Sequence, residues 1–420
     1  MTRSPFLPVT GRLAALALAC VLGAPALRAQ SGPPAAPLTL AEAIRRATTV
    51  APATQAAAGR RAEIVGRART EAQWANPIVE LRRENLGSPL DYDDFATLTL
   101  PLDLLGRRFA LRSALGAQRE SAVADSVRTI REAEYATARA WWTAWATQVI
   151  AGIAESQADL YARMARVDSL RAAEGELSEA TAFRMQLEAQ RARHEAGTAR
   201  ATHLHARAVL ATLIGTSDTT WVLADAELTG MGALPPLDSL LAAADRDRPD
   251  LIIARAAERA ADRRRAAEVR GSLQDVGLTG GYKGTAGLST TVVGLTIAAP
   301  LLNSNGGNRE RSMGEWLLAN ADRRTAEWRV ENEVRAAYAG AQMIEAATRG
   351  FDASFAARAT VVADAAEAAY REGAASLVEL LDAFRAAADA RAALVRGTHD
   401  RALARLDLQR AIGAPAVEVP

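Results

Sequence analysis

Apolar residues in two long stretches of the chain recur at intervals of three and four. One example is the series Leu377, Leu381, Phe384, Ala388 and Val395. This spacing is typical of helices that pack against one another as coiled coils. The pattern therefore predicts long, closely packed helices in both stretches.

Proline and composition indicate how long these helices are. Proline is absent from 102–234 and from 301–414, and the good helix formers alanine, arginine, glutamate and leucine dominate both windows. A continuous helix from about Leu104 to Ala172 would be on the order of 105 Å long. A helix of that length needs partners along its whole surface.

Between the helices the alternation changes to a period of two, which predicts strands. The predicted strands are 77–86, 95–102, 275–284 and 289–300. Each is about the 9 to 11 residues that a tilted transmembrane strand needs, with one apolar face and one polar face. We expect the apolar face to contact lipid and the polar face to contact water.

A few side chains in these strands are less regular. Tyr92, Phe95 and Tyr282 lie near strand ends and are expected to be aromatic residues at the membrane interface. Arg83 alternates in step with Val79 and Leu81, which places a charge on the face expected to contact lipid. This position has no explanation unless Arg83 lies near a lipid headgroup.

The chain repeats one plan at an offset of about 198 positions. The matched landmarks are Leu40 and Leu237, Pro52 and Pro249, Pro101 and Pro300, Gly175 and Gly373, Ser178 and Ser376, and Gly215 and Gly413. Each half is expected to contain a helix, two strands, a very long helix, a turn and a return helix. The expected segments are a leader (1–29), a first repeat (30–215), an equatorial linker (216–236), a second repeat (237–413) and a short tail (414–420).

The leader has the pattern of an export signal. Arg3 and Arg12 flank its start, Leu13–Leu22 is a short apolar run, and small residues follow. The one cysteine, Cys20, lies inside this segment, so the mature chain would have no disulfide. A lipoprotein cleavage site at Cys20 is the alternative interpretation.

Composition narrows the classes of function. The 420 residues are 49% hydrophobic but only 5% aromatic, and the formal net charge is +1, which indicates no nucleic-acid partner. No later stretch approaches the roughly 20 apolar residues of a transmembrane helix, so any membrane-spanning part is β structure. No phosphate loop, nucleophile elbow or pair of catalytic acids occurs in a supporting context, so we expect neither an enzyme nor a cofactor.

The four histidines raise the question of a metal site. His203 and His205 are two apart on a predicted helix and do not share a face, unlike a metal-binding pair four apart. We expect His194, His203, His205 and His399 to be structural or solvated, with no metal bound.

Four strands cannot close a barrel, and lipid tolerates no unpaired sheet edge. A membrane-inserted protomer must therefore oligomerise. The alternative is a pair of soluble hairpins on a helical bundle.

Several groups of residues carry a family resemblance. They are Leu38, Leu40, Ala43 and Ile44; Leu98, Thr99, Leu100, Pro101 and Leu102; Leu295, Thr296, Ile297 and Pro300; Arg335, Ala337 and Tyr338; and Tyr370, Gly373, Ser376, Leu377, Leu380, Leu381 and Asp382. In these positions the mature chain resembles TolC-like outer-membrane efflux proteins. The resemblance implies a homotrimer whose four strands per protomer form a 12-stranded barrel in outer-membrane lipid, continued by an α-barrel of long antiparallel helical hairpins across the periplasm.

The resemblance also implies partners and a docking site. The closed periplasmic tip would meet a periplasmic adaptor and an inner-membrane pump, with the turns Gly175 to Ser178 and Gly373 to Ser376, and Leu377 beside the second, at this tip. Glycine permits the reversal and serine caps the returning helix. Ser178 is followed by Glu179, Ala180 and Thr181 where the second half has a leucine-rich run, so the two turns are not expected to dock equally.

Charged residues near the second turn suggest a gate. Asp364, Arg371, Glu372 and Asp382 are expected to form charge rings or latches that hold the channel shut. The sequence thus predicts a passive export duct for small molecules or metal ions in the outer membrane, driven by a pump elsewhere. The alternative is a soluble periplasmic coiled-coil adaptor or structural protein, and the exported substrate cannot be deduced from the sequence.

Overall fold

The structure is a computed structural model that describes residues 37–50, 52–86, 93–219, 221–224, 233–271, 276–298, 304–350 and 352–416. The predicted leader, with Cys20, lies outside the described residues, as do Tyr92 and the last four residues of the predicted tail.

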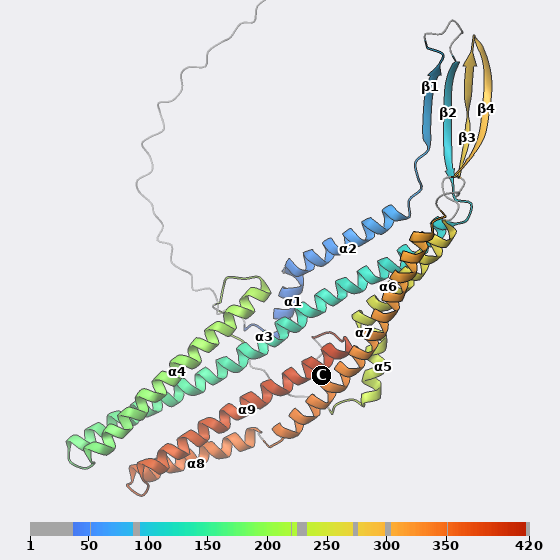
Figure 1. The fold of residues 1–420 in the computed structure, drawn as a ribbon. Helices are drawn as coiled ribbons and strands as arrows, with labels where there is room; N and C mark the ends of the chain where they lie inside the picture. Colours follow the sequence, from blue (N-terminus) through green and yellow to red (C-terminus); the bar gives the residue numbers. More distant parts are fainter. Residues whose placement is uncertain are drawn as a thin grey trace, which may run out of the picture. The chain divides into compact units, whose positions relative to one another are not determined.

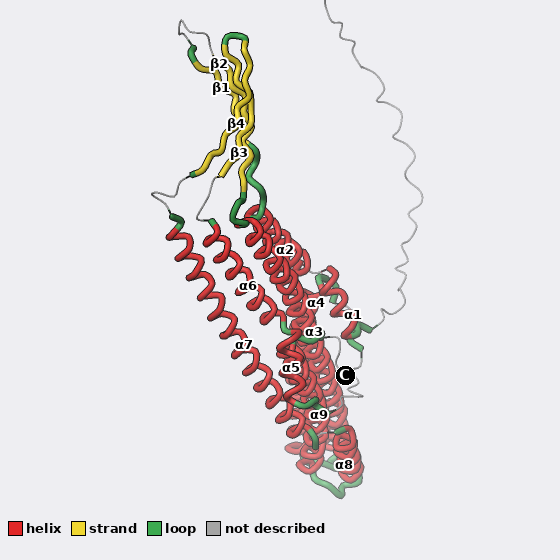
Figure 2. Tube along the Cα trace, turned by 90° about the vertical axis from the view of Figure 1, so that its right-hand side faces the viewer, coloured by secondary structure: helices red, strands yellow, loops and turns green. Residues whose placement is uncertain are grey.

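Helices make up most of the described chain, and four strands interrupt them (Figure 1). The helices are α1 (Leu40–Val50), α2 (Pro52–Glu71), α3 (Arg107–Ala173), α4 (Glu179–Ile214), α5 (Leu237–Asp247), α6 (Pro249–Arg270), α7 (Gly306–Thr348), α8 (Ala353–Arg371) and α9 (Leu377–Ile412). The strands are β1 (Ile78–Glu84), β2 (Asp93–Leu102), β3 (Val276–Thr285) and β4 (Leu288–Ile297). Figure 2 separates the group of strands from the helices by colour.

The segment before each strand pair is two helices rather than the single helix expected. α1 and α5 each have 11 residues and each is followed by a second helix that begins at Pro52 or Pro249. Proline lacks an N–H and suits the first position of a helix, where that group has no partner. The prolines therefore restart the helix in both halves.

α3 is one continuous helix of 67 residues, close to the length predicted. The carboxylate of Asp103 accepts hydrogen bonds from the backbone N–H groups of Arg107 and Arg108, at 2.9 and 2.8 Å. These bonds satisfy two of the free donors at the helix start, and Gly106 turns the chain into the helix with a φ of 71°.

The corresponding long helix of the second half is broken, so the prediction of one continuous helix is wrong there. α7 ends at Thr348, Gly350 follows, and α8 begins after Asp352. The Asp352 carboxylate accepts from the backbone N–H of Phe355 at 2.8 Å, which is an N-cap. A glycine and a capping aspartate end and restart a helix without proline.

The four strands form one antiparallel sheet in the order β1-β2-β3-β4. β2 comes from the first half of the chain and β3 from the second, and they pair from Asp93↔Thr285 to Leu102↔Val276. The sheet therefore joins the two halves. Among the described strands, β1 and β4 each have only one neighbour.

Two of the four strands, β1 and β4, end slightly earlier than the alternation predicted. β1 stops at Glu84, because Asn85 adopts a left-handed φ of 63° that a strand does not accommodate. β4 begins at Leu288 and ends at Ile297, three residues before the expected end at Pro300.

Four helices follow the order of the strands. α2 packs against α3, α3 against α6, and α6 against α7. α2 precedes β1, α3 follows β2, α6 precedes β3 and α7 follows β4. The row of helices therefore has the same order as the row of strands. α2 lies at the edge that corresponds to β1, and α7 lies at the edge that corresponds to β4.

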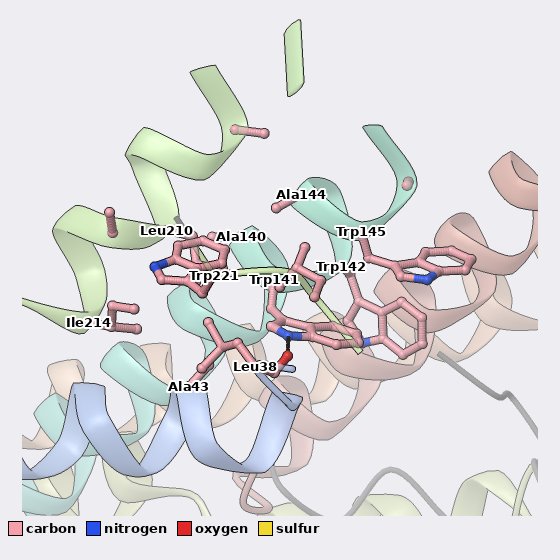
Figure 3. Packing of buried hydrophobic residues seen from close by; sticks show 14 of the residues in the cluster. Leu38, Ala43, Ala140, Trp141, Trp142, Ala144, Trp145, Leu210, Ile214 and Trp221 are labelled. Atoms are coloured by element: carbon pink, nitrogen blue, oxygen red, sulfur yellow. Dashed lines mark hydrogen bonds between the residues drawn. The ribbon is translucent and has the colours of Figure 1, made fainter. Parts of the chain in front are cut away.

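A buried cluster of large aromatic and aliphatic side chains joins α1, α3 and α4 (Figure 3). Trp142 of α3 contacts both Trp141 and Trp145 edge to face, and the indole N–H of Trp141 donates to the carbonyl of Leu38 at 3.0 Å. Most other buried core residues are alanines, which allow helix axes to approach closely.

Candidate functional site

The two helical hairpins, α3 with α4 and α8 with α9, turn in the same way. Gly175 and Gly373 both adopt left-handed φ values, 81° and 76°, which cost a residue with a Cβ about 1 to 2 kcal/mol. The residue after each glycine donates to a carbonyl five positions back. The two bonds are Glu176 N to Arg171 O at 2.9 Å and Ala374 N to Ala369 O at 2.8 Å. Both turns are Schellman motifs.

The helices that return from the turns are capped unequally. Ser178 Oγ accepts from the backbone N–H of Thr181 at 3.2 Å. Ser376 Oγ accepts from Glu379 N at 3.3 Å, and the Glu379 carboxylate accepts from Ser376 N at 2.7 Å. This second set is a full capping box, and the hydrogen bond from the Ser376 backbone lowers the pKa of Glu379.

The residues after the turns are also buried unequally. Leu377 and Leu381 are 6% and 3% exposed, whereas Phe183, which is equivalent to Leu381 at the repeat offset, is 68% exposed. Leu377 and Leu381 belong to a buried cluster, here called the turn cluster, formed by α3, α4, α8 and α9. Its members are Ala158, Tyr161, Met164, Ala165, Met185, Ala189, Ala192, Ala196, Ala363, Tyr370, Leu377, Leu380, Leu381, Phe384 and Ala387. The second hairpin is thus anchored by its returning helix.

One buried hydrogen bond joins the two hairpins next to their turns. The phenol of Tyr370 in α8 donates to Oδ2 of Asp168 in α3 at 2.9 Å. Asp168 is 1% exposed, and its Oδ1 has no hydrogen-bond partner in the described part of the chain. Burial raises the pKa of Asp168, and burial together with the bond to Asp168 raises the pKa of Tyr370 to about 12.

A second polar contact joins the hairpins further along. Arg385 of α9 donates to Glu188 of α4 at 2.5 Å, and Glu188 also accepts from Arg191 of its own helix. The Glu188 carboxylate is nearly buried while the Arg385 side chain is half exposed. Neither contact could be predicted from the sequence, because the two partners are about 200 positions apart in each case. Of the four residues, only Tyr370 belongs to the groups that carry the family resemblance.

The four charged residues predicted to gate the channel are not brought together within one protomer. Arg371 pairs with Glu367, one turn earlier in α8, and not with the other hairpin. Asp364, Glu372 and Asp382 are exposed and form no ion pair with the residues that the structure describes. Their role in gating stays a prediction.

Asp364 has a specific environment nonetheless. It lines a hollow of about 250 Å³ between α3, α8 and α9, together with Arg163, Glu367 and Arg391. Two acids and two arginines therefore surround this space. Asp364 faces charges of its own protomer here.

The sheet has one apolar face that is exposed. Leu81, Val293 and Leu295 are 78%, 77% and 61% exposed. The register places them on one face with other apolar side chains, namely Val79, Leu98, Leu100, Leu278, Tyr282 and Ile297. A soluble monomer rarely exposes a contiguous apolar surface of this kind.

Arg83 lies on this apolar face, and the structure explains it. Its guanidinium donates to both carboxylate oxygens of Asp94, at 2.5 and 2.7 Å. Asp94 is its register partner on β2. The bidentate pair neutralises both charges near the ends of the strands.

Phe95 lies on the opposite, polar face, so the prediction of an interfacial aromatic is wrong for this residue. Its register partners are Arg82 on β1 and Lys283 on β3. Nearness to a strand end does not decide which face a side chain occupies, because parity does. Tyr282, with the other parity, lies on the apolar face.

The described residues offer neither a metal site nor a transmembrane helix. No three histidine, cysteine, aspartate or glutamate side chains gather as metal ligands. No helix among them combines the length and apolar composition needed to cross a bilayer. His203 lies near Thr147 and His399 near Thr143, so both contact polar side chains of α3.

Residues 240–414 match the family described as Outer membrane efflux protein. No curated protein matches the chain.

Solved structures of outer membrane proteins have a similar fold over nearly the whole chain. The outer membrane protein VceC of Vibrio cholerae is 18% identical with a TM-score of 0.72, over 90% of this chain and 96% of that one. The CmeC outer membrane channel of Campylobacter jejuni is 13% identical with a TM-score of 0.73, over 90% and 87%. The open state of the MtrE outer membrane channel of Neisseria gonorrhoeae is 18% identical with a TM-score of 0.72, over 90% and 89%.

These similarities confirm the predicted fold class and the predicted resemblance to outer-membrane efflux proteins. At these identities the structures show the fold. The docking and gating residues are not tested by them.

Proposed function

We propose that this chain is the outer-membrane channel of a tripartite efflux system, located in the outer membrane and extending into the periplasm. It is a passive duct: solutes diffuse through it, and an inner-membrane pump supplies the energy through a periplasmic adaptor. No residue of the chain performs chemistry in this function.

The amphipathic sheet carries the proposal. Its apolar face is exposed while the residues of its polar face, such as Thr97, Thr99 and Thr279, are partly covered, which indicates that the sheet curves toward the polar side. A curved sheet with a lipid-facing apolar surface and two unpaired edges is a segment of a barrel. Three copies complete 12 strands, with β4 of one copy beside β1 of the next.

The helices continue the same closed arrangement. Because α2 and α7 follow the order of β1 and β4, the contacts that close the sheet also bring α7 of one copy beside α2 of the next. The homotrimer then forms one wall from membrane to turns.

The two turns are the proposed docking site for the adaptor. Gly175, Ser178, Gly373, Ser376 and Leu377 fix the turns and the directions of the returning helices. The hydrogen bond between the hairpins near these turns would hold the closed state, and docking would separate the hairpins. Asp364, Arg371, Glu372 and Asp382 are proposed to act between copies of the chain.

Two adjacent valines provide the test of membrane insertion. Val293 lies on the apolar face and Val292 on the polar face of the same strand. Val293→Arg should disfavour insertion by about 2 to 4 kcal/mol, the cost of arginine near the bilayer midplane, whereas Val292→Arg should insert normally because it faces water. The readouts are the yield of trimer from the outer-membrane fraction, extracted in mild detergent, and its conductance in planar bilayers.

The soluble adaptor or structural protein predicts a different result. Val293 would then face water, so the two variants would behave alike and the chain would be recovered from the periplasm without detergent. Equal recovery of both variants without conductance would reject the channel.

A further inference from the structure

The register divides the polar face of the sheet into rows that cross all four strands. From the ends of the strands at Glu84 and Leu288 inward, the first four rows are Glu84, Asp93, Thr285 and Leu288; Arg82, Phe95, Lys283 and Thr290; Glu80, Thr97, Gly281 and Val292; and Ile78, Thr99, Thr279 and Gly294. The first two rows carry most of the charge. The rows further in carry mainly threonine and glycine.

Phe95 is the one aromatic side chain on this face within the four described strands. The guanidinium of Arg82 lies 4.7 Å and the ammonium of Lys283 lies 5.0 Å from the centre of its ring. These cations come from the two strands that flank β2, so they approach the ring from opposite sides. Cations bind the faces of an aromatic ring, and here one cation lies on each side of it. The ring therefore stands away from the sheet instead of lying flat on it.

The cations are themselves held in place. Arg82 lies 3.2 Å from a carboxylate oxygen of Glu84, and Lys283 lies 3.1 Å from one of Asp93. Each cation thus bridges the ring to an acid of the neighbouring row. The second row is therefore a connected unit in which the phenyl ring has little freedom to rotate away.

The rows on the inner side of Phe95 carry less side-chain bulk on β3, because two of the positions on this strand are glycines. A Cβ at Gly281 would lie 2.7 Å from the Cα of Thr97, and one at Gly277 would lie 2.8 Å from the Cγ2 of Thr99. Side chains are excluded there by the close approach of β2 and β3. No side chain projects from these two positions on β3.

We propose that Phe95, held upright by Arg82 and Lys283, is the size-selecting constriction of the duct inside the sheet. In the assembled barrel three such rings meet the passing solute at one level, and the central strands carry threonine and glycine in the rows on the inner side. The proposal rests on the proposed function, because it requires the polar face to line a water-filled path. It assigns the narrowest point inside the sheet to a single residue per copy.

Access to a cysteine placed on the inner side of Phe95 tests the constriction without involving the turns. Thr296 is exposed on the polar face, six residues along β4 from the row of Phe95, or about 20 Å away. Thr296→Cys is labelled in intact cells with a small maleimide and with a bulky maleimide that cannot enter through other pores. Phe95→Ala in this background should raise the labelling rate of the bulky reagent about tenfold and leave that of the small reagent unchanged.

A graded series and a matched control make the result specific. With Phe95→Leu, the labelling rate of the bulky reagent should lie between the rates for the parent and for Phe95→Ala. With Phe95→Trp, this rate should fall below that of the parent. Leu98→Ala, a truncation on the apolar face of the same strand, should change neither rate. A variant that fails to assemble is recognised because the small reagent then no longer labels a membrane-embedded trimer, and the remaining members of the series decide.

The outcomes separate the two proposals. If the small reagent labels Thr296→Cys and the bulky reagent reacts at one rate across the Phe95 series, the constriction lies elsewhere and the inference is overturned while the duct stands. If the small reagent does not label Thr296→Cys in the assembled protein, the polar face lines no aqueous path and the proposed function fails with it.

Discussion

The two hairpins share a turn and differ in how that turn is anchored. Gly175 and Gly373 make the same reversal, but only Ser376 has the reciprocal bond from a glutamate. Beyond the turn, Leu381 is buried where the equivalent Phe183 is exposed. Local backbone rules therefore fix both turns, while the side chains that follow decide which hairpin is held.

This difference suggests a division of labour between the hairpins. The first hairpin leaves several large apolar side chains exposed near its turn, namely Val167, Leu170, Phe183 and Leu187. The second hairpin places its leucines in the turn cluster and its Tyr370 against Asp168. Beyond the turn itself, the first hairpin is therefore more exposed and the second is more firmly anchored.

Truncation of the two equivalent side chains, Leu381 and Phe183, should have the largest and most unequal effects. Leu381→Ala should lower the free energy of local opening of the second hairpin by about 2 to 5 kcal/mol, because a buried leucine leaves a cavity. Phe183→Ala should change local opening by less than about 0.5 kcal/mol, since the ring is exposed, but should weaken adaptor binding. Hydrogen exchange of the amides in α4 and α9 measures the first effect and adaptor pull-down the second. Equal loss of protection in both helices would show that the hairpins are anchored alike.

The next effect concerns the bond between the hairpins. Tyr370→Phe removes the donor and leaves the buried Asp168 carboxylate without its partner, which should cost about 1.5 to 3 kcal/mol and favour the open state. Single-channel recordings should show a larger open probability than the parent. Tyr338→Phe, on a partly buried tyrosine of α7, is the matched control and should record like the parent.

The same bond gives a pH dependence with a defined sign. The pKa of Asp168 in the folded protein lies above its ordinary value of 3.8, so the folded state binds this proton more tightly. The stability from this group is complete below pH 3.8 and is lost as the pH rises through the raised pKa. Closure should therefore weaken with rising pH in that window, and Asp168→Asn should remove the dependence. An unchanged pH profile in the Asn variant would mean that another group titrates.

The smallest expected effect is at Arg371. Its pair with Glu367 is exposed and lies within one helix, so Arg371→Ser should cost only about 0.3 to 0.5 kcal/mol of helix stability. Any larger change in conductance would show that Arg371 acts between copies of the chain, as proposed for the gate. Unchanged conductance would count against a latch at this residue.

Parts of the molecule that follow local rules could be predicted from the sequence. Glycine and serine at the two turns, proline at the starts of α2 and α6, and period-two alternation in the strands all act over a few residues. The break between α7 and α8 could not be predicted from proline, because Asp352 caps a helix after a glycine. The contact of Asp168 with Tyr370 joins positions about 200 apart, and one sequence contains no record of such a pairing.

The unpaired edges of β1 and β4 also affect the rate at which the protein enters the membrane. The outer backbone N–H and C=O groups of β1 and β4 lack partners within the described chain, so a lone protomer has no stable way to enter lipid. In the proposed homotrimer, insertion then depends on how often copies meet, and its rate should rise steeply with the amount of chain delivered to the membrane. When the protein is made slowly, uninserted protomers with open sheet edges should therefore persist longer before the sheet closes.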